Sequence, residues 1–249
     1  MIIEVDTIAA VSTAAGAGAL AVVRWSGPDA GPLLLRLAPG LDALPEARRA
    51  TLVEVRDPAD GALLDVAIAT FYRGPASYTG EDLVELSCHG GWLGPELVLD
   101  ACARAGARRA DAGEFTRRAY LRGKLDLVQA EAVADLVEAR SRAMRRAALG
   151  HLERGLSARV AGLREALVEV EAVLAHHIDF PEEDDAPVPR TEIAARGSAV
   201  ARDIRALLAS APEGELLREG ALAVLAGRPN TGKSSLYNAL IGEERAIVT

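Results

Sequence analysis

Residues 227–234 read Gly-Arg-Pro-Asn-Thr-Gly-Lys-Ser, which matches the phosphate-binding loop pattern of one glycine, four residues and then Gly-Lys-Ser. The continuous apolar run at residues 221–226 predicts a buried parallel strand before this loop, and residues 235–241 predict the opening of a helix after it. Strand, loop and helix therefore follow one another in the order that a phosphate site requires. The C-terminal stretch is predicted to begin an α/β P-loop domain.

The residues of this loop predict a specific chemistry. Gly227 and Gly232 carry no Cβ and permit backbone amides to approach an anion at the helix N-terminus. Lys233 is predicted to bridge the β- and γ-phosphates, and the Ser234 hydroxyl to ligate Mg²⁺ between them. The loop alone does not separate GTP from ATP.

Composition limits the class of protein. The chain has 249 residues, of which 50% are hydrophobic and 26% charged, as is ordinary for a globular protein of one or two domains. No run approaches the roughly 18 apolar residues of a membrane span, and the N-terminus lacks the pattern of a signal peptide. We expect a cytoplasmic protein without a membrane partner. Its two cysteines suggest neither a metal pair nor a disulfide scaffold.

The net charge of −8 argues against nucleic-acid binding by the whole surface. One local stretch is basic, and within it only Asp111 and Glu114 are acidic. A solvated helix or loop face explains this stretch better than a nucleic-acid site. Its basic residues are Arg104, Arg108, Arg109, Arg117, Arg118, Arg122 and Lys124.

Up to residue 111 the pattern is short apolar runs separated by Gly and Pro, which predicts a mixed α and β domain. Strands are predicted at residues 7–13, 19–25, 51–56, 63–72 and 83–87, with a hairpin turn at 57–61. Helices are predicted at residues 28–37, with Ser26 near the cap, and at 95–105. The glycines at 16 and 18 resemble a dinucleotide-binding pattern, but strand follows them where that pattern needs a helix, so we expect a hairpin turn.

From Asp126 the apolar period becomes helical. Asp126 and Gln129 predict a capping box, and the pattern continues to residue 178 as one long helix or as two helices broken near Gly150 and Gly155. An acidic loop is predicted at residues 180–187 and another helix at 191–211. The predicted fold is therefore an α+β N-terminal domain, an all-α middle domain and the start of an α/β P-loop domain.

Two other pairs of residues are candidates for chemistry. Cys88 and His89 are neighbours on a predicted strand, so their side chains point to opposite faces and cannot act together. His176 and His177 are adjacent on a predicted helix, about 100° apart, and make a poor metal pair. Both pairs are interpreted as structural.

Several stretches taken together resemble the MnmE family, also called TrmE, of tRNA-modification GTPases from bacteria and organelles. Besides the phosphate-binding loop, they are Asp-Thr-Ile-Ala at 6–9, Arg-Trp-Ser-Gly at 24–27, Gly-Pro-Ala-Ser-Tyr-Thr-Gly-Glu-Asp-Leu-Val-Glu-Leu at 74–86, Cys-His-Gly-Gly at 88–91, Gly-Glu-Phe-Thr at 113–116, Gly-Lys-Leu-Asp-Leu-Val-Gln-Ala-Glu-Ala at 123–132 and Ile-Asp-Phe-Pro-Glu at 178–182. The resemblance covers the whole chain. It implies a folate-binding and dimerising domain at residues 1–122, a helical domain at 123–218 and the start of a GTPase domain at 219–249.

The resemblance also implies a function and partners. Members hydrolyse GTP with Mg²⁺ and K⁺ and form homodimers. With an FAD-dependent partner, MnmG, they assemble into a heterotetramer that adds a carboxymethylaminomethyl-type group at carbon 5 of the wobble uridine of tRNA. The one-carbon unit comes from 5-formyl- or 5,10-methylene-tetrahydrofolate.

Site residues are carried over position by position. The family's folate contacts fall on Arg24, Glu85 and Lys124, although any one of them alone would fit a structural ion pair. Arg and Lys suit folate carboxylates, and a Glu can accept hydrogen bonds from the pterin. The implied GTP-binding residues are Asn230, Thr231, Gly232, Lys233, Ser234, Ser235 and Thr249, with Ser234 on Mg²⁺ and Asn230 and Thr249 on K⁺.

Departures from the family pattern leave alternatives open. The sequence ends before the family's switch motifs and guanine-reading motif, so we expect a fragment of a longer protein, inactive alone and without a catalytic residue. Ala14 and Ala112 stand where Pro is expected, and Arg122 where Asn is common. One alternative is a folate-binding dimerisation module with an inert loop. Another is a ribosome-assembly GTPase, which leaves residues 1–219 without a purpose.

Overall fold

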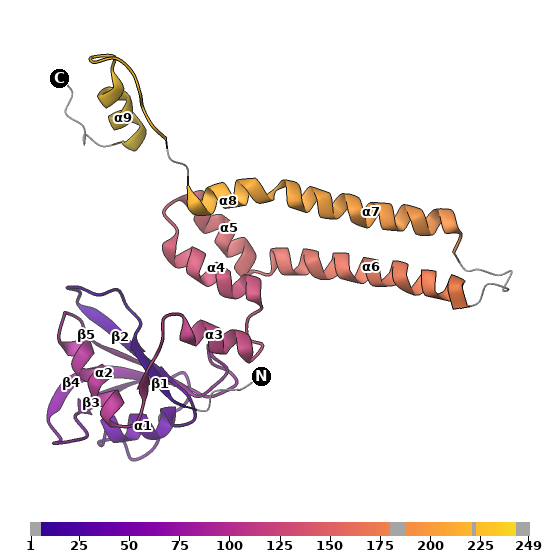
Figure 1. The fold of residues 1–249 in the computed structure, drawn as a ribbon. Coiled ribbons are helices and arrows are strands. Elements are labelled where there is room, and N and C mark those ends of the chain that lie inside the picture. Colours follow the sequence, from indigo (N-terminus) through magenta and orange to yellow (C-terminus); the bar gives the residue numbers. More distant parts are fainter. Residues whose placement is uncertain (1–5, 180–187, 221–222, 243–249) are drawn as a thin grey trace. The chain divides into compact units, whose positions relative to one another are not determined.

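In the computed structural model, a mixed sheet with three helices is followed by helices, as Figure 1 shows, so the predicted order of an α+β part and an all-α part is confirmed. The structure describes residues 6–179, 188–220 and 223–242. These residues fall into two compact units, which are described separately. The first unit contains residues 1–138 and 148–159, and the second contains residues 139–147 and 160–249. The three-domain division at 122 and 218 stays a prediction.

The sheet of the first unit has the strand order β3-β4-β5-β2-β1-β6. All neighbouring strands are antiparallel except β1 and β6, which are parallel. The predicted hairpin is confirmed, since Asp57 N donates to Ala62 O between β3 and β4 and Gly61 adopts a positive φ of 75°. The strands are β1 Ile8–Val11, β2 Leu20–Ser26, β3 Ala50–Arg56, β4 Leu63–Tyr72, β5 Leu83–His89 and β6 Arg108–Arg109.

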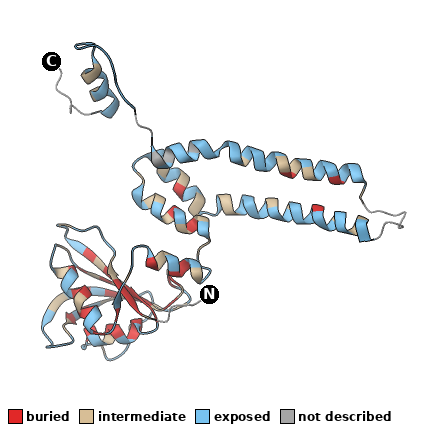
Figure 2. Ribbon diagram, viewed as in Figure 1, coloured by how far each residue is buried: buried red, intermediate tan, exposed pale blue. Residues whose placement is uncertain are grey.

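Alternation along the strands places the core on one face of the sheet. Ala21, Val23 and Trp25 of β2 and Val84, Leu86 and Cys88 of β5 are buried in one cluster with residues of α1 (Ala30–Leu37) and α2 (Gly94–Arg104). Figure 2 marks the buried residues of the sheet in red. Because successive side chains on a strand alternate between faces, the intervening residues point to the other face of the sheet. That face carries two of the candidate folate residues, Arg24 and Glu85.

The glycine-rich turn and one predicted cap have different outcomes. Residues 12–19 connect the antiparallel strands β1 and β2, which confirms the hairpin interpretation of Gly16 and Gly18. Ser26, predicted near the cap of the next helix, does not cap it. Ser26 ends β2 and its buried hydroxyl contacts Thr79 Oγ1 at 2.7 Å, while Asp29 is the residue before α1. The Ser26 hydroxyl therefore bonds Thr79, more than 50 residues away in the sequence, instead of an N–H group of the neighbouring helix.

The helical region is more divided than its periodicity indicates. The capping box is confirmed, because Gln129 N donates to Asp126 Oδ1 at 2.9 Å and Asp126 N donates to Gln129 Oε1 at 3.1 Å. The predicted break near Gly150 and Gly155 is confirmed, since α5 ends at Leu152 and α6 begins at Gly155. The prediction of one or two helices up to residue 178 is wrong, since three helices occupy this stretch. Ser141, whose hydroxyl accepts from Met144 N at 3.1 Å, begins a new helix that apolar spacing did not reveal. The helices are α3 Glu114–Leu121, α4 Leu127–Glu138, α5 Arg142–Leu152 and α6 Gly155–Asp179.

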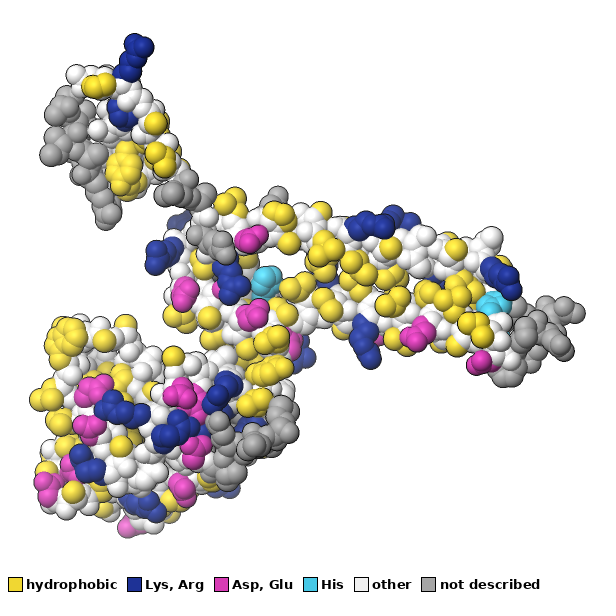
Figure 3. Space-filling model, viewed as in Figure 1, with side chains coloured by type: hydrophobic (Ala, Val, Ile, Leu, Met, Phe, Trp, Pro, Cys, Tyr) yellow, Lys and Arg dark blue, Asp and Glu magenta, His cyan; other side chains and the backbone are white. Residues whose placement is uncertain are grey.

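Among the described residues, the second unit contains the first part of α5, most of α6 and three further helices. The predicted helix at 191–211 is present as α7 Arg190–Ala209, and it is followed by α8 Ala211–Glu219 and α9 Lys233–Ile241. Figure 3 shows hydrophobic side chains gathered along α6 and α7. His177 Nε2 lies 2.8 Å from Val188 O, which agrees with a structural histidine. The predicted acidic loop at 180–187 lies outside the described residues.

The buried strand predicted at 221–226 is wrong as far as the structure describes it. Residues 223–226 form neither strand nor helix and are exposed, with Val224 at 77% exposure, and residues 221 and 222 lie outside the described part. A strand needs a neighbour to complete its ladder of hydrogen bonds. Among the described residues, the strands belong to the sheet of the first unit.

Candidate functional site

Two of the three predicted folate residues form a direct ion pair. Arg24 on β2 stands opposite Glu85 on β5 in the antiparallel register. Arg24 Nε and Nη2 both donate to Glu85 Oε1, at 3.0 and 2.5 Å. The side chains are 26% and 30% exposed, on the sheet face opposite α1 and α2. The fold thus joins residues that are 61 positions apart and leaves the pair open to solvent.

Three aromatic residues surround this pair. The Arg24 Cζ atom lies 5.5 Å from the ring centroid of Tyr78 and 5.7 Å from that of Phe115. Tyr72 OH donates to Glu85 Oε2 at 3.3 Å. Burial, together with the nearby Glu85 carboxylate, raises the pKa of Tyr72, so this hydroxyl stays a donor. Sequence reasoning missed all three, and although Tyr78 and Phe115 stand in the quoted motifs, only the fold shows what they contact.

Lys124 reaches the same neighbourhood through the loop of residues 73–82, which joins β4 to β5. The Lys124 ammonium donates to Pro75 O at 3.0 Å, and a Cβ on Gly80 would lie 3.3 Å from Lys124 Cγ. Tyr78 belongs to this loop as well. Among the described residues the ammonium donates to Pro75 O, and not to Arg24 or Glu85. The loop therefore links Lys124 to the Arg24–Glu85 pair without direct contact between them.

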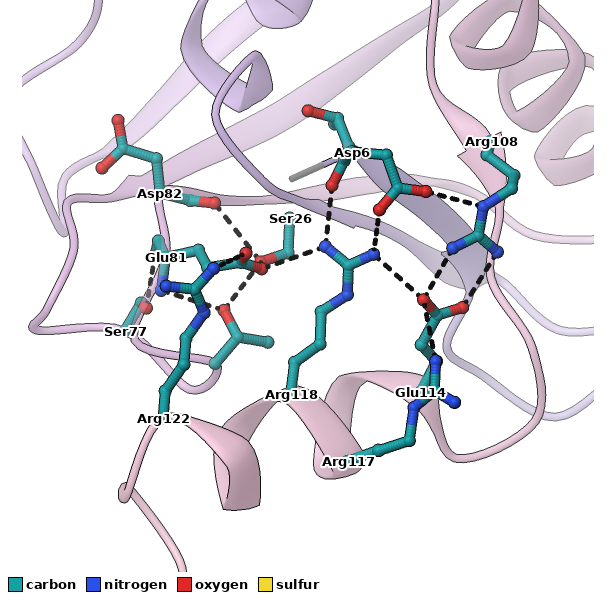
Figure 4. Close-up of polar contacts among 12 residues, drawn as sticks. Asp6, Ser26, Ser77, Glu81, Asp82, Arg108, Glu114, Arg117, Arg118 and Arg122 are labelled. Atoms are coloured by element: carbon teal, nitrogen blue, oxygen red, sulfur yellow. Dashed lines mark hydrogen bonds and ion pairs between the residues drawn. The ribbon is translucent and has the colours of Figure 1, made fainter. Parts of the chain in front are cut away.

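A charge network beneath this loop fixes it to α3, as Figure 4 shows. Glu114, which is 1% exposed, accepts from Arg108 and Arg118, and Arg118, which is 3% exposed, also bonds Asp6 at 2.6 Å. Glu81 is 7% exposed and accepts from Arg118 and Arg122. We define the charge network as Asp6, Glu81, Arg108, Glu114, Arg118 and Arg122. It joins the start of the chain, the 73–82 loop and α3 around buried carboxylates.

This network corrects the interpretation of the basic stretch. The solvated-face interpretation is wrong for Arg118, which is buried, and the arginines of the stretch pair with carboxylates. Arg104 bonds Asp57 at 2.6 Å, and Arg109 bonds Glu96 at 3.0 Å and Asp100 at 2.7 Å. Arg117 lies 3.6 Å from Glu114. Most of these acids lie outside the stretch, so counting charges within it could not find them. Figure 3 shows the two signs interspersed on this unit.

The cysteines and His89 do not form a nucleophile and base. Cys88 is buried and donates to Ala21 O at 3.5 Å, whereas His89 Nδ1 lies 2.6 Å from Asp65 Oδ1 on the opposite face. Burial raises the pKa of Cys88 and raises that of Cys102 to about 12, so both thiols stay protonated at neutral pH. The sequence prediction that Cys88 and His89 cannot act together is confirmed.

The phosphate-binding loop lies in the second unit. Gly232, at φ 82°, precedes α9, which begins at Lys233, so Ser234 and Ser235 lie in its first turn. Asn230 also has a positive φ of 61°. Lys233 Nζ donates to Arg228 O at 2.6 Å, and Thr231 Oγ1 donates to the same carbonyl at 2.8 Å. The loop therefore places Asn230, Thr231 and the helix N-terminus together, while Thr249 lies outside the described residues.

Comparison with known families covers nearly the whole chain. The family described as "GTP-binding protein TrmE N-terminus" matches residues 7–124, and the one described as "MnmE helical domain" matches residues 127–236. No helix among the described residues has the length and apolar character needed to cross a bilayer.

Individual curated proteins are also similar to this chain along nearly its whole length. The tRNA modification GTPase MnmE of Akkermansia muciniphila is 47% identical over 246 residues, which are 98% of this chain and 54% of that protein. The proteins of the same name from Thiobacillus denitrificans and Symbiobacterium thermophilum are 47% and 48% identical, over 98% of this chain and 54% of each relative. The chain therefore spans about half the length of the curated relatives it matches.

Proposed function

Because this chain belongs to the family of tRNA modification GTPase MnmE proteins, we propose that the protein of which it forms part binds and hydrolyses GTP and modifies tRNA. The loop at residues 227–234 supports the first part of this proposal. Its glycine at a positive φ and its helix N-terminus have the geometry that favours a phosphate group. Lys233 would exchange the Arg228 carbonyl for phosphate oxygens, since an ammonium binds an anion more strongly than a neutral carbonyl.

Two ions belong to the proposed nucleotide site. Ser234, in the first turn of α9, would hold Mg²⁺ through its hydroxyl. Asn230 would hold K⁺ through its amide oxygen, and Thr249 would complete that site. The left-handed backbone at Asn230 suits this residue type, because asparagine tolerates a positive φ better than most residues.

The first unit would supply a tetrahydrofolate site. The observation that carries this proposal is the Arg24–Glu85 pair, a half-exposed donor and acceptor side by side on the open sheet face. Glu85 would accept hydrogen bonds from the amino and ring N–H groups of the pterin, with Arg24 beside it. Lys124, an exposed cation held by the 73–82 loop, would pair with a carboxylate of the ligand. The ligand would be 5-formyl- or 5,10-methylene-tetrahydrofolate.

The remaining parts of the proposed function concern partners. The protein would act as a cytoplasmic homodimer and combine with an FAD-dependent partner of MnmG type in a heterotetramer. Together they would add a carboxymethylaminomethyl-type group at carbon 5 of the wobble uridine in tRNA. The folate would provide the one-carbon unit. These parts are supported by the family membership and by the side chains of Arg24, Glu85 and Lys124, whose charges and hydrogen-bonding groups complement those of a folate.

The folate site is tested by Glu85→Ala and Lys124→Ala. The first change leaves a pterin edge without its acceptor, and the second leaves a carboxylate without its cation. Each is expected to weaken binding of 5-formyltetrahydrofolate to the 249-residue chain by about ten- to a hundredfold, or ~1–3 kcal/mol. Lys124→Arg is expected to weaken binding too, since a planar guanidinium does not replace a compact ammonium. Calorimetric titration measures the affinity.

The control for Glu85→Ala is Glu46→Ala, which removes an exposed carboxylate whose ion pair with Arg49 spans 3.5 Å. This variant should bind the ligand as tightly as the unaltered chain. Thermal melts establish that every variant is folded. If folded Glu85→Ala and Lys124→Ala keep the full affinity, the two side chains are structural and the proposed folate site is wrong.

Gly80→Ala tests how the 73–82 loop holds Lys124. The new Cβ would lie 3.3 Å from Lys124 Cγ and 3.5 Å from Arg122 Cβ, at a φ of 79°. We expect a loss of about 1–3 kcal/mol of stability from the backbone strain. We also expect roughly threefold to tenfold weaker folate binding from displacement of Lys124, since ~1.4 kcal/mol is a factor of ten. Denaturant titration and calorimetry measure the two effects.

Gly61→Ala is a matched control for this variant. Gly61 has a φ of 75° in the β3–β4 turn, and a Cβ there would meet no atom within 4 Å. It should lose a similar amount of stability and keep its folate affinity. Equal affinities of the two variants would show that Gly80 does not position Lys124.

A further inference from the structure

The Arg24 guanidinium has aromatic neighbours on two separate elements. Its Cζ atom lies 5.5 Å from the ring centroid of Tyr78 in the 73–82 loop and 5.7 Å from that of Phe115 on α3. Both distances lie within the range in which a cation is attracted to the face of a ring. Arginine is well suited to this, because stacking on a ring leaves its in-plane N–H groups available for a carboxylate. Here those groups, Nε and Nη2, donate to Glu85.

Each ring is itself fixed by its surroundings. Tyr78 OH lies 2.8 Å from Thr116 Oγ1, so the tip of the Tyr78 side chain is attached to α3. Thr79, the next residue, is fully buried and bonds Ser26. Phe115 directly follows Glu114, the buried carboxylate of the charge network. The rings therefore sit on anchored backbone, whereas Arg24 has a long flexible side chain that is 26% exposed.

We infer that Tyr78 and Phe115 are positioning residues that hold the Arg24 guanidinium against Glu85, so that the two charged side chains meet a ligand as one preformed unit. This inference rests on the proposed folate function, because the ligand is the one proposed there. The physical reason is that an immobilised side chain loses less conformational freedom when a ligand binds. Without the rings, the half-exposed pair would spend part of its time apart, as surface ion pairs do.

The Tyr78 ring makes the contact with Arg24, whereas its hydroxyl faces Thr116 and is one of two anchors of that ring, the other being the buried neighbour Thr79. Tyr78→Phe should therefore preserve the position of Arg24, and Tyr78→Leu should lose it. Phe115→Leu should behave like Tyr78→Leu. Tyr120→Leu is the control, because Tyr120 is an exposed tyrosine on the same helix, α3. Its replacement should leave Arg24 as it is.

The first measurement needs no ligand. In the NMR spectrum of the 249-residue chain, the Arg24 Nε–H donates to Glu85 and should exchange slowly with water. We expect slow exchange in the unaltered chain, Tyr78→Phe and Tyr120→Leu. In Tyr78→Leu and Phe115→Leu we expect exchange about twofold to fivefold faster, the factor that corresponds to losing one exposed cation–π contact of ~0.5–1 kcal/mol. Unchanged exchange in both leucine variants would overturn the inference.

The second measurement is a double-mutant cycle for binding of 5-formyltetrahydrofolate. Tyr78→Leu should weaken binding about threefold to tenfold when Arg24 is present, and by less than about twofold when Arg24→Ala is already in place. A ring that serves only the stability of the loop would cause equal losses in both backgrounds, and that result would overturn the inference. If the unaltered chain binds no folate, the proposed function fails, while the exchange measurement still decides whether the rings position Arg24.

Discussion

Glu114→Gln is expected to lower the free energy of unfolding of the first unit by about 3–5 kcal/mol. Glu114 is 1% exposed and its carboxylate accepts from Arg108, from Arg118 and from Asp111 N, at 2.7–3.1 Å. Glutamine keeps the shape but loses the negative charge. The cost is large because Arg118, itself 3% exposed, would keep a buried positive charge with less compensation.

The same carboxylate predicts how stability depends on pH. Burial alone would raise the pKa of Glu114, but hydrogen bonds from Arg108, Asp111 N and Arg118 outweigh it and lower the pKa from 4.5 to about 2. A carboxylate with a lowered pKa in the folded state stabilises the fold above its unfolded pKa. That contribution is lost as the pH falls from about 4.5 to about 2. Asp6, whose burial is likewise outweighed by bonds from Arg108 and Arg118, also has a lowered pKa.

Urea titration at several pH values measures both effects, with the fluorescence of the buried Trp25 as one probe. In Glu114→Gln the acid-dependent loss of stability should shrink, since the titrating group is gone. Glu46→Gln, which alters an exposed carboxylate, should change neither the stability nor its pH dependence. A loss below about 1 kcal/mol in Glu114→Gln would mean that the charge network contributes no more than a surface ion pair does.

Lys233→Ala is expected to reduce nucleotide binding by the full-length protein by about a hundredfold or more. Lys233 begins α9, and its ammonium already reaches back across the loop to Arg228 O at 2.6 Å, where phosphate oxygens would lie close to the backbone amides. Charge-assisted hydrogen bonds to phosphate are among the strongest that a side chain makes, at ~1.5–3 kcal/mol each. An alanine at this position offers none of them.

Titration with a fluorescent GDP or GTP analogue in the presence of Mg²⁺ measures this affinity. Arg196→Ala is the control, because it removes an exposed cation of α7 whose ion pair is with Glu192 on the same helix. It should bind nucleotide as the unaltered protein does. Tight binding by folded Lys233→Ala would show that the loop at residues 227–234 does not serve the phosphates, and the GTPase proposal would lose its support in this chain.

Local patterns predicted the local structure well. The hairpin around Gly61 and the capping box of Asp126 and Gln129 depend on residues within five positions of one another, so the sequence displays all the participants. The opening of α9 after the glycine loop is of the same kind. The break before α5 was missed, because it depends on Ser141 and not on the apolar spacing that indicated a continuous helix.

The candidate site depends on contacts between distant residues, and here sequence patterns were weaker. Resemblance selected Arg24 and Glu85, and the strand register then placed them opposite each other. Nothing in the local pattern predicts that Tyr78 and Phe115 flank Arg24, or that Glu81 pairs with Arg118 and Arg122. The strand prediction was wrong at residues 223–226 for a related reason. A strand is defined by its neighbours as much as by its own residues.

Because Arg24 on β2 stands opposite Glu85 on β5, insertions and deletions should be poorly tolerated within these two strands. Side chains alternate between the two sheet faces with a period of two, so deleting one residue between Leu20 and Arg24 would shift the register of β2 by one position. Trp25 would then have to leave the core or Arg24 would have to enter it. Insertions and deletions should therefore accumulate in turns such as 57–61, whereas β2 and β5 should keep a constant length across species.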